Sequence, residues 1–315
     1  MFDLADYYSI NSVMLDEHFR SLPPIINFSN KEFYNDRIRV MRKDSSDDVV
    51  IDMVKVPDGK VDMDATRNLP EIESLVKTLH EIIIDDERKN SEKPVTIGII
   101  SPFRAQVEQL KISVPKVLSD YMIKKHKIEI GTAHTFQGDE RDIILMSWAF
   151  ANNSYPQSIT FLQKPNLFNV AITRAKNKCI NFVSHDLETM PDGHFRHYVS
   201  YLKEYKERKE ALKNNEIDEN IYKNSLEREV ADAIRKLEHK VCAGVEIAGL
   251  SADLVVDDKF IIEVDGMEDN KKLHHMSNMK KQAILERCGF KVKRITYREW
   301  QYSAKACLDR VLTIE

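Results

Sequence analysis

Three acidic residues in the last third of the chain have a spacing that suits metal-assisted cleavage of a phosphodiester. Glu263 and Asp265 are separated by one residue in the strand-like run FIIEVDG (260–266). Residues i and i+2 of a strand face the same side, so these carboxylates point together, and an adjacent antiparallel strand brings Asp253 beside them. Three carboxylates on one sheet face are costly unless a cation neutralises them. Mg²⁺ takes oxygen ligands and keeps several waters, one of which can attack a phosphodiester.

Other residues around this run can complete such a site. A further carboxylate can come from the preceding amphipathic helix, and basic groups can come from the helix that follows the strand. The candidates are Glu227 and Glu229 on the first helix, and His274, His275, Lys280, Lys281 and Gln282 after the strand. An alternative stays open, in which Asp253 and Asp265 are turn or edge-strand residues and FIIEVDG ends in an Asp-Gly hairpin turn.

Four segments of the first 190 residues carry arginines and small polar residues near the ends of apolar runs. Arginines neutralise the charge that builds on a γ-phosphate, an effect worth about 10³–10⁵ in rate, and a glycine lets backbone approach a phosphate closely. The segments are LDEHFRSLPPIINFSNKEFY (15–34) with His18 and Arg20, GIISPFRAQVEQL (98–110) with Ser101, Arg104 and Gln106, GTAHTFQGDERDIIL (131–145) with Gln137, Gly138 and Glu140, and NLFNVAITRAKNKCINF (166–182), in which Thr173 and Arg174 are expected inside a helix.

In this order the four segments resemble the later motifs of the second RecA-like domain of superfamily 1B helicases, the group that includes the nonsense-decay and Okazaki-fragment-processing helicases. The resemblance covers residues 10–185. It implies that Arg20 and Arg174 contact the γ-phosphate of ATP, which is bound with Mg²⁺. It further implies a nucleotide–motor interface made by Gln137, Gly138 and Glu140, with Glu140 near the ribose, and a nucleic-acid track bordered by Ser101, Pro102, Thr132 and His134.

The signatures of the first motor domain do not occur in the sequence. None of the nine glycines opens a GxxxxGK[ST] phosphate loop, and the one GK pair, Gly59-Lys60, is followed by valine. No apolar strand ends in the Asp-Glu pair that holds Mg²⁺ and the catalytic water. In the resembled family both features lie on the first RecA-like domain. We therefore expect a C-terminal portion, an expressed fragment or a naturally separate half of a larger helicase, unable to hydrolyse ATP alone.

A second resemblance covers residues 223–302. The helix SLEREV, the acidic run SADLVVDDKFIIEVDG and the closing block LERCGFKVKRITYREW are similar to the PD-(D/E)xK nuclease superfamily, closest to the Vsr-like domains often appended to bacterial helicases. The resemblance implies that Glu227 is the carboxylate of the first helix, that Asp253 and Glu263 bind Mg²⁺, and that Asp265 takes the place of the signature lysine. Where the family often has a histidine three residues past the glycine, this chain has Asp269.

Together the two resemblances imply an ATP-dependent helicase–nuclease, a hydrolase that cuts nucleic acid with Mg²⁺. They favour DNA over RNA, as in bacterial genome-defence proteins. Two alternatives remain open. The nuclease fold can be catalytically inactive and bind nucleic acid or a partner. The chain can also be an interaction module that docks onto a separately encoded first RecA-like domain.

The elements that must position these residues form an α/β chain in two domains. Residues 1–190 alternate helical patterns with apolar runs at 95–103, 127–136, 141–150 and 178–184, which indicates a RecA-like parallel sheet covered on both faces. Residues 191–222 are dense in Lys and Glu at helical spacing, and we expect an exposed helical connector or a basic nucleic-acid contact. Residues 223–315 follow an α–β–β–β–α–β order, a small α+β restriction-endonuclease-like domain.

The composition of the 315 residues limits the kinds of partner and compartment. The net charge of −4 argues against a globally basic nucleic-acid binder but is compatible with a local basic groove. The four cysteines lie far apart and form no CxxC pair, which argues against a zinc site or a disulfide framework and fits a reduced cytoplasm. No apolar run is long enough to span a membrane.

Overall fold

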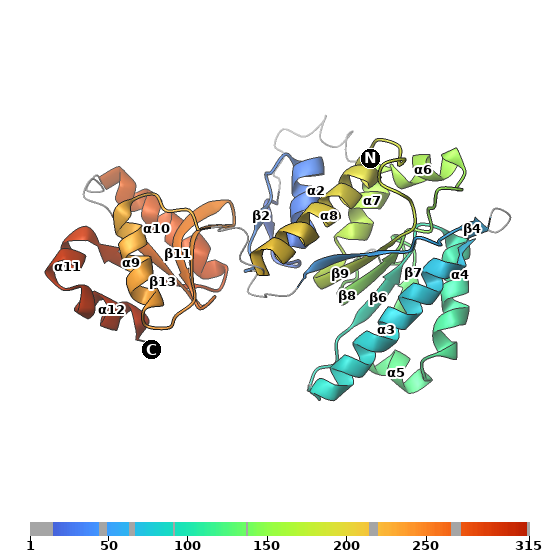
Figure 1. Cartoon of the computed structure of the whole chain (residues 1–315), viewed down its shortest axis with the longest axis horizontal. Coiled ribbons are helices and arrows are strands. Elements are labelled where there is room, and N and C mark those ends of the chain that lie inside the picture. The colour runs from blue at the N-terminus through green and yellow to red at the C-terminus, as the bar shows by residue number, and fades with distance from the viewer. Residues whose placement is uncertain are drawn as a thin grey trace.

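A parallel five-stranded sheet organises the first part of the chain (Figure 1). The computed structural model describes residues 15–43, 49–62, 67–90, 92–136, 138–213, 220–265 and 272–313, without the side chains at 212, 213 and 272–278. The strand order is β3-β9-β8-β6-β7, and every pair in this sheet is parallel. The strands are β3 (Ile51–Lys55), β6 (Ile97–Ile100), β7 (Glu129–Gly131), β8 (Arg141–Ser147) and β9 (Ala175–Val183).

Helices cover both faces of this sheet, as the continuous apolar strands predict. They are α2 (Pro23–Tyr34), α3 (Leu69–Lys89), α4 (Arg104–Ser113), α5 (Asp120–Lys125), α6 (Pro156–Leu162), α7 (Pro165–Ile172) and α8 (His194–Lys213), with a 3₁₀ turn η1 (Val114–Lys116). Adjacent strand residues alternate between two cores: Ile144 packs with α2, α7 and α8, whereas Leu145 packs with α3 and α4. A strand segment buried on both faces favours apolar residues, which is why β6 and residues 143–146 of β8 lack charged and polar side chains.

The helix α8 corrects the expectation of an exposed connector over residues 191–222. The segment is helical, but Phe195, Tyr198 and Leu202 are at most 2% exposed and belong to the core on one face of the sheet. Their i, i+3, i+7 spacing forms an apolar stripe that the surrounding Lys and Glu residues conceal in the composition. The ring of Phe195 lies 4.8 Å from that of Trp148, centroid to centroid. The first half of α8 is therefore part of the fold around the parallel sheet.

A second, four-stranded sheet follows, in the order β10-β11-β12-β13. Its strands are β10 (Val241–Ile247), β11 (Leu250–Val256), β12 (Phe260–Asp265) and β13 (Lys291–Thr296), of which only the β12–β13 pair is parallel. The helices α9 (Ser225–Arg235), α11 (Tyr297–Tyr302) and α12 (Ala304–Leu312) pack on one face, and α10 (Lys272–Arg287) packs on the other. The expected α–β–β–β–α–β order is confirmed, and two short helices extend it.

The free edge of β10 is covered by the chain that leads into α9. The N–H of Ile221 donates to the carbonyl of Ala243 at 3.2 Å, and the side-chain oxygen of Asn220 accepts from the N–H of Ala243 at 2.8 Å. Gly244 has a φ of +67°, and a Cβ there would lie 2.6 Å from the carbonyl oxygen of Ile221. Glycine thus permits both the backbone conformation and the close approach of the covering segment.

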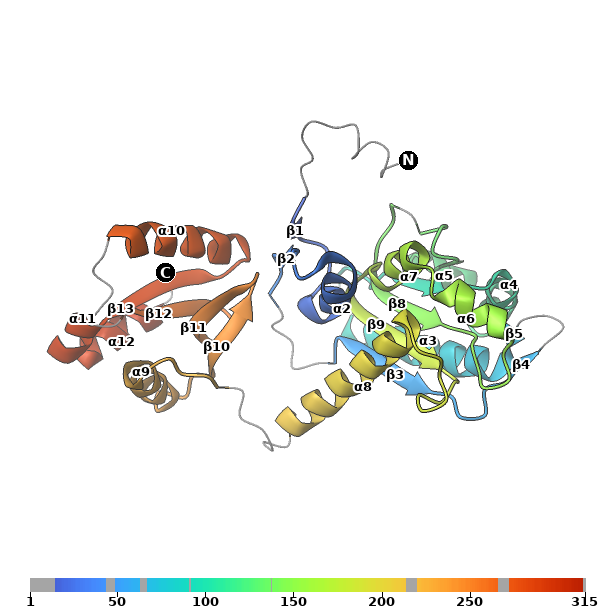
Figure 2. The same cartoon turned by 90° about the horizontal axis from the view of Figure 1, so that it is seen from above.

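Two small ladders complete the fold. β1 (Glu17–His18) pairs in parallel with β2 (Arg39–Val40), and β4 (Val61–Asp62) pairs with β5 (Arg67–Asn68) in antiparallel fashion. The β1–β2 ladder lies between the two larger sheets (Figure 2). Among the helices of the described residues, none has the length and apolar character required to cross a bilayer.

Candidate functional site

Two carboxylates of the acidic run come together, and a third joins them from the preceding helix. We call Glu227, Asp253 and Glu263 the acidic cluster. Each is at most 6% exposed, and they come from α9, β11 and β12. The N–H of Asp253 donates to Oε1 of Glu263 at 3.4 Å, and the N–H of Val264 donates to Oδ2 of Asp253 at 2.9 Å. Antiparallel pairing of β11 with β12 is what brings the two strand carboxylates together.

Burial and mutual repulsion disfavour charge in this cluster. Burial raises the pKa of Glu227 and of Glu263 above the ordinary glutamate value, and the nearby charge of Asp253 adds to both rises. A cation placed among these oxygens would relieve that repulsion. The donor set therefore fits a hard cation such as Mg²⁺ in its chemistry. Within the described ranges, however, no group of three or more His, Cys, Asp and Glu side chains has the arrangement of a metal site.

Two lysines supply the cationic partners of the cluster. The ammonium of Lys281, on α10, donates to Oε2 of Glu263 and lies 4.0 Å from Oδ1 of Asp253. Lys223, just ahead of α9, donates from its ammonium to Oδ1 of Asp253, and its backbone N–H donates to Oε2 of Glu227 at 2.7 Å. The sequence named Lys281 among several candidates but did not indicate Lys223, which stands in no recognisable motif.

The remaining candidates of this region have other partners or are exposed. Asp265, expected beside Glu263 and Asp253, forms an ion pair at 3.0 Å with Arg294, which is the register partner of Glu263 on β13. Glu229 accepts from the indole N–H of Trp300 at 3.0 Å. Lys280 is exposed, and Gln282 donates to Glu286 on its own helix. Asp269 and the side chains of His274 and His275 lie outside the described residues.

Arg20, one of the two arginines expected at the γ-phosphate, belongs to an ion-pair network around Glu140. Nε of Arg20 donates to Oε2 of Glu140 at 2.7 Å, and Lys176 pairs with Oε1 of the same residue at 2.5 Å. The pKa of Glu140 is held below its ordinary value, first by Lys176 and then by Arg20. Burial and then the charge of Arg20 lower the pKa of Arg174, and the guanidinium of Arg174 donates to the carbonyls of Val170 and Asp139. Two positive charges that repel one another favour an anion near them.

The other residues expected at the nucleotide are placed around this pair. Thr173 and Arg174 follow α7, which ends at Ile172, and the carbonyl of Arg174 accepts from the N–H of Arg141. They therefore lie between α7 and β9 rather than inside the helix. Gly138 has a φ of +85°, and an added Cβ would meet no atom within 4 Å, whereas Gln137 lies outside the described residues. Burial, together with Arg20 and Arg42, lowers the pKa of His18 to about 4, so its imidazole is neutral.

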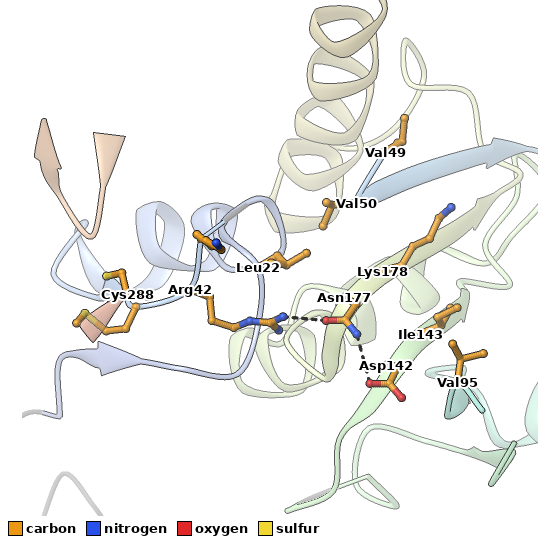
Figure 3. A pocket seen from close by; sticks show the side chains of 12 residues that line it. Leu22, Arg42, Val49, Val50, Val95, Asp142, Ile143, Asn177, Lys178 and Cys288 are labelled. Atoms are coloured by element: carbon orange, nitrogen blue, oxygen red, sulfur yellow. Dashed lines mark hydrogen bonds between the residues drawn. The ribbon is translucent and has the colours of Figure 1, made fainter. Parts of the chain in front are cut away.

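Arg42 is a residue of this site that the sequence did not indicate. Its guanidinium donates to the carbonyls of Arg20 at 2.5 Å and of Lys176 at 3.0 Å. It also reaches Oδ1 of Asn177 at 2.9 Å, and Asn177 donates in turn to Asp142 (Figure 3). These groups line a cavity of about 550 Å³. Arg42 thus fixes the backbone beside both Arg20 and the start of β9.

The residues expected along the nucleic-acid track lie at the carboxyl ends of β6 and β7. Ser101 is fully buried, and its hydroxyl accepts from the N–H of Phe103 at 3.4 Å, so it shapes the loop and does not present a hydroxyl to solvent. Pro102 and Thr132 are half-buried and His134 is exposed. The carboxyl ends of parallel strands form the usual ligand edge of an α/β sheet.

Two protein-family models match the chain. The AAA_12 model, described as an AAA domain, matches residues 1–186, and the REase_MTES_1575 model matches residues 226–314. A solved structure of the C-terminal domain of a possible DNA helicase from Lactobacillus plantarum WCFS1 is 14% identical and has a TM-score of 0.34, with 53% of this chain and 87% of that chain covered. That likeness is too distant to add to the argument.

Two curated proteins illustrate the similarity. The protein mov-10-B.2 of Danio rerio, named as a helicase, is 29% identical over an alignment of 187 residues that covers 52% of this chain and 18% of that protein. The DNA replication ATP-dependent helicase/nuclease DNA2 of Gallus gallus is 30% identical over 186 residues, covering 53% of this chain and 16% of that protein. The chain spans less than a fifth of the length of either relative. Because the AAA domain model covers 186 of the 315 residues, the chain belongs to the AAA domain family, as the second motor domain of a superfamily 1 helicase followed by a nuclease-like REase_MTES_1575 region.

Proposed function

We propose that this chain is the second motor half of a helicase joined to a magnesium-dependent nuclease, and that the whole protein acts on nucleic acid, DNA in preference to RNA. The division we propose is a motor unit over residues 1–190, a helix and link over 191–222 and a nuclease unit over 223–315. The observation that carries the nuclease proposal is the convergence of Glu227, Asp253 and Glu263 with Lys281, from four separate elements.

Asp253 and Glu263 are the residues that would hold Mg²⁺, with Glu227 as a further oxygen donor. When bound, the ion would polarise the scissile phosphate and make a bound water more acidic. The ammonium of Lys281, on α10, contacts Glu263 and lies 4.0 Å from Asp253. At this position it can neutralise a phosphate oxygen. Lys223 holds Asp253 and, through its backbone N–H, orients Glu227.

The test is cleavage of single-stranded DNA, duplex DNA and RNA with Mg²⁺ and with EDTA. We expect Glu263→Gln to lower the cleavage rate by about 100-fold or more, because it removes a charged ligand. Glu246→Gln changes an exposed glutamate on β10 of the same sheet and serves as the matched control. Equal cleavage by both variants, or cleavage that survives EDTA, would rule out this site as the source of the activity.

A nucleic-acid clamp without cleavage is the second candidate function. The observation in its favour is that Lys223 and Lys281 already neutralise Asp253 and Glu263. This candidate predicts that the chain retains DNA in a binding assay, releases no product with Mg²⁺ or Mn²⁺, and binds equally well after Glu263→Gln. Product formation by the wild-type chain alone would reject it.

For the motor half we propose that Arg20 and Arg174 contact the γ-phosphate of an ATP held by a first RecA-like domain. The charge of Arg20 acting on Arg174, and the ion pair of Arg20 with Glu140, support this role. The sequence holds no phosphate loop, so the purified chain should show no nucleic-acid-stimulated ATP hydrolysis. Robust turnover by the purified chain would contradict the proposal.

A further inference from the structure

Three consecutive residues, Met41, Arg42 and Lys43, contact the two parts of the chain in alternation. We call them the bridge segment. Met41 is 3% exposed and packs in the core between the four-stranded sheet and α10, with Ile261 and Leu285 among its neighbours. In that core, among the described residues, it is the single member from the first part of the chain.

Lys43 repeats the contact of Met41 with the C-terminal part. Its ammonium donates to the carbonyl of Asp258 at 2.9 Å and lies 5.2 Å from the centroid of the Phe290 ring. Asp258 belongs to the turn between β11 and β12, and Phe290 precedes β13. Lys43 therefore contacts the end of the sheet at which the parallel strands β12 and β13 both begin.

Arg42, between them, faces the motor half. Its guanidinium donates to the carbonyl of Arg20 and to that of Lys176, which follows Arg174 by two residues. These two hydrogen bonds fix the backbone at Arg20 and at the start of β9. The N–H of Leu22 also donates to the carbonyl of Lys176, at 3.0 Å. The segments around Leu22 and Arg42 are therefore both bonded to this one oxygen. Hydrogen bonds from a charged donor are among the stronger ones in proteins.

The β1–β2 ladder adds a second tie between the same two places. Glu17, three residues ahead of Arg20, forms a two-pronged ion pair with Arg287 at 2.9 and 2.5 Å. The N–H of Met41 donates to the carbonyl of His18 at 2.7 Å. Figure 2 shows the ladder between the parallel sheet and α10. The same helix α10 carries Arg287 at its end and Lys281 at the acidic cluster.

From these contacts we propose that the bridge segment couples the position of Arg20 to the seating of α10, so that the nucleotide state of the motor controls the placement of Lys281 in the acidic cluster. The regulatory consequence rests on the proposed nuclease function. The coupling itself is a mechanical property of the fold. It does not depend on catalysis and can be measured without it.

The experiment is hydrogen–deuterium exchange on the whole chain, with Arg42→Gln as the first variant. Its direct effect falls on amides near Arg20 and Lys176. Coupling adds a remote effect at Cys288 and Phe290, whose N–H groups bond within the end of α10. We expect exchange there to rise by up to about 5-fold, relative to core amides of β8. Lys178→Gln, another cation lining the same cavity, is the control and should leave these amides unchanged.

The reverse perturbation is Arg287→Gln, at an exposed position that the fold tolerates. It removes the ion pair to Glu17 and should raise exchange at Leu22 and Met41 by a similar factor. Changes confined to the mutated side in both variants would overturn the coupling, and if Arg42→Gln does not fold, Arg287→Gln decides alone. Cleavage by the wild type and Glu263→Gln reports separately on the nuclease, so the two proposals fail independently.

Discussion

The ammonium of Lys281 on α10 lies against Oε2 of Glu263 on β12, so a helix supplies one of the two cations of the acidic cluster. The two residues are eighteen positions apart and belong to elements on different layers. A lysine can reach the strand carboxylates from α10 because its long apolar stem runs along the packed surface and extends the charge past it. Asp265, which shares the strand with Glu263, is engaged by Arg294 instead.

Replacing Lys281 should weaken cleavage without unfolding the chain. We expect Lys281→Met to lower the single-turnover rate by about 10–100-fold, because the cluster and the phosphate lose a positioned charge. Lys280→Met, its exposed neighbour on the same helix, is the control and should cut at the wild-type rate. Equal rates for the two variants would show that Lys281 only balances charge in the fold.

Arg20→Ala should stop ATP turnover in the assembled motor. With a first RecA-like domain supplied, we expect the rate to fall by about 10³, the lower end of what an arginine finger contributes. Nucleotide affinity, measured by fluorescence with a labelled analogue, should change much less than the rate. Arg37→Ala removes an exposed arginine after α2 and should leave turnover intact. A parallel loss in both variants would point to a damaged interface.

Phe195→Ala should destabilise the first part of the chain strongly. The ring is fully buried against Trp148, and truncating a buried Phe costs about 3–5 kcal/mol. Lys203→Ala, at an exposed position on the same helix, should change the free energy of unfolding by about 0.5 kcal/mol or less. Urea denaturation followed by the fluorescence of Trp148, in a Trp300→Phe background, measures both. Similar midpoints for the two variants would mean that α8 is not part of this core.

Glu71 should make the stability depend on pH. This carboxyl on α3 is fully buried, accepts from Ser147 and from the N–H of Ala149, and burial raises its pKa to about 8. The folded chain then holds a proton that the unfolded chain has lost, so the stabilisation is full below about pH 4.5 and is lost as the pH rises towards 8.

The slope attributable to Glu71 is at most about 1.4 kcal/mol per pH unit. We expect Glu71→Gln to remove that part of the slope in urea titrations between pH 5 and 8, while leaving the contributions of other groups in place. The same pH dependence in both chains would mean that Glu71 is ionised in the folded state.

Local patterns predicted most of the fold. The unbroken apolar runs of β6 and β8 specify burial on both faces, and Asp253 and Glu263 follow from strand alternation once β11 and β12 pair. The helical spacing of Phe195, Tyr198 and Leu202 is also a local pattern. The many charged residues between them led to the prediction of an exposed helix. That prediction was wrong because it rested on the composition of the segment and not on the spacing of its apolar residues.

The long-range partners could not be predicted in this way. Lys223 and Arg42 owe their contacts to how the segments that carry them pack on distant elements, and Lys281 could not be singled out from the other candidates on its helix. Such packing is a tertiary property, and the residue type at a single position does not predict it. Strand alternation predicts which face of the sheet the side chain of Asp265 lies on. It does not predict that Arg294, on the next strand, donates to that carboxylate.

The covering of the β10 edge by Asn220 and Ile221 decides where the nuclease unit can be cut free. An exposed strand edge is a template for pairing with other chains. A fragment starting at Ser225, the first residue of α9, would lose this cover and Lys223 together. We expect such a fragment to aggregate, so that a cleavage assay on it would wrongly indicate an inactive nuclease. A fragment that begins ahead of Asn220 keeps the segment that covers the edge of β10, and it is therefore suitable for the cleavage assay.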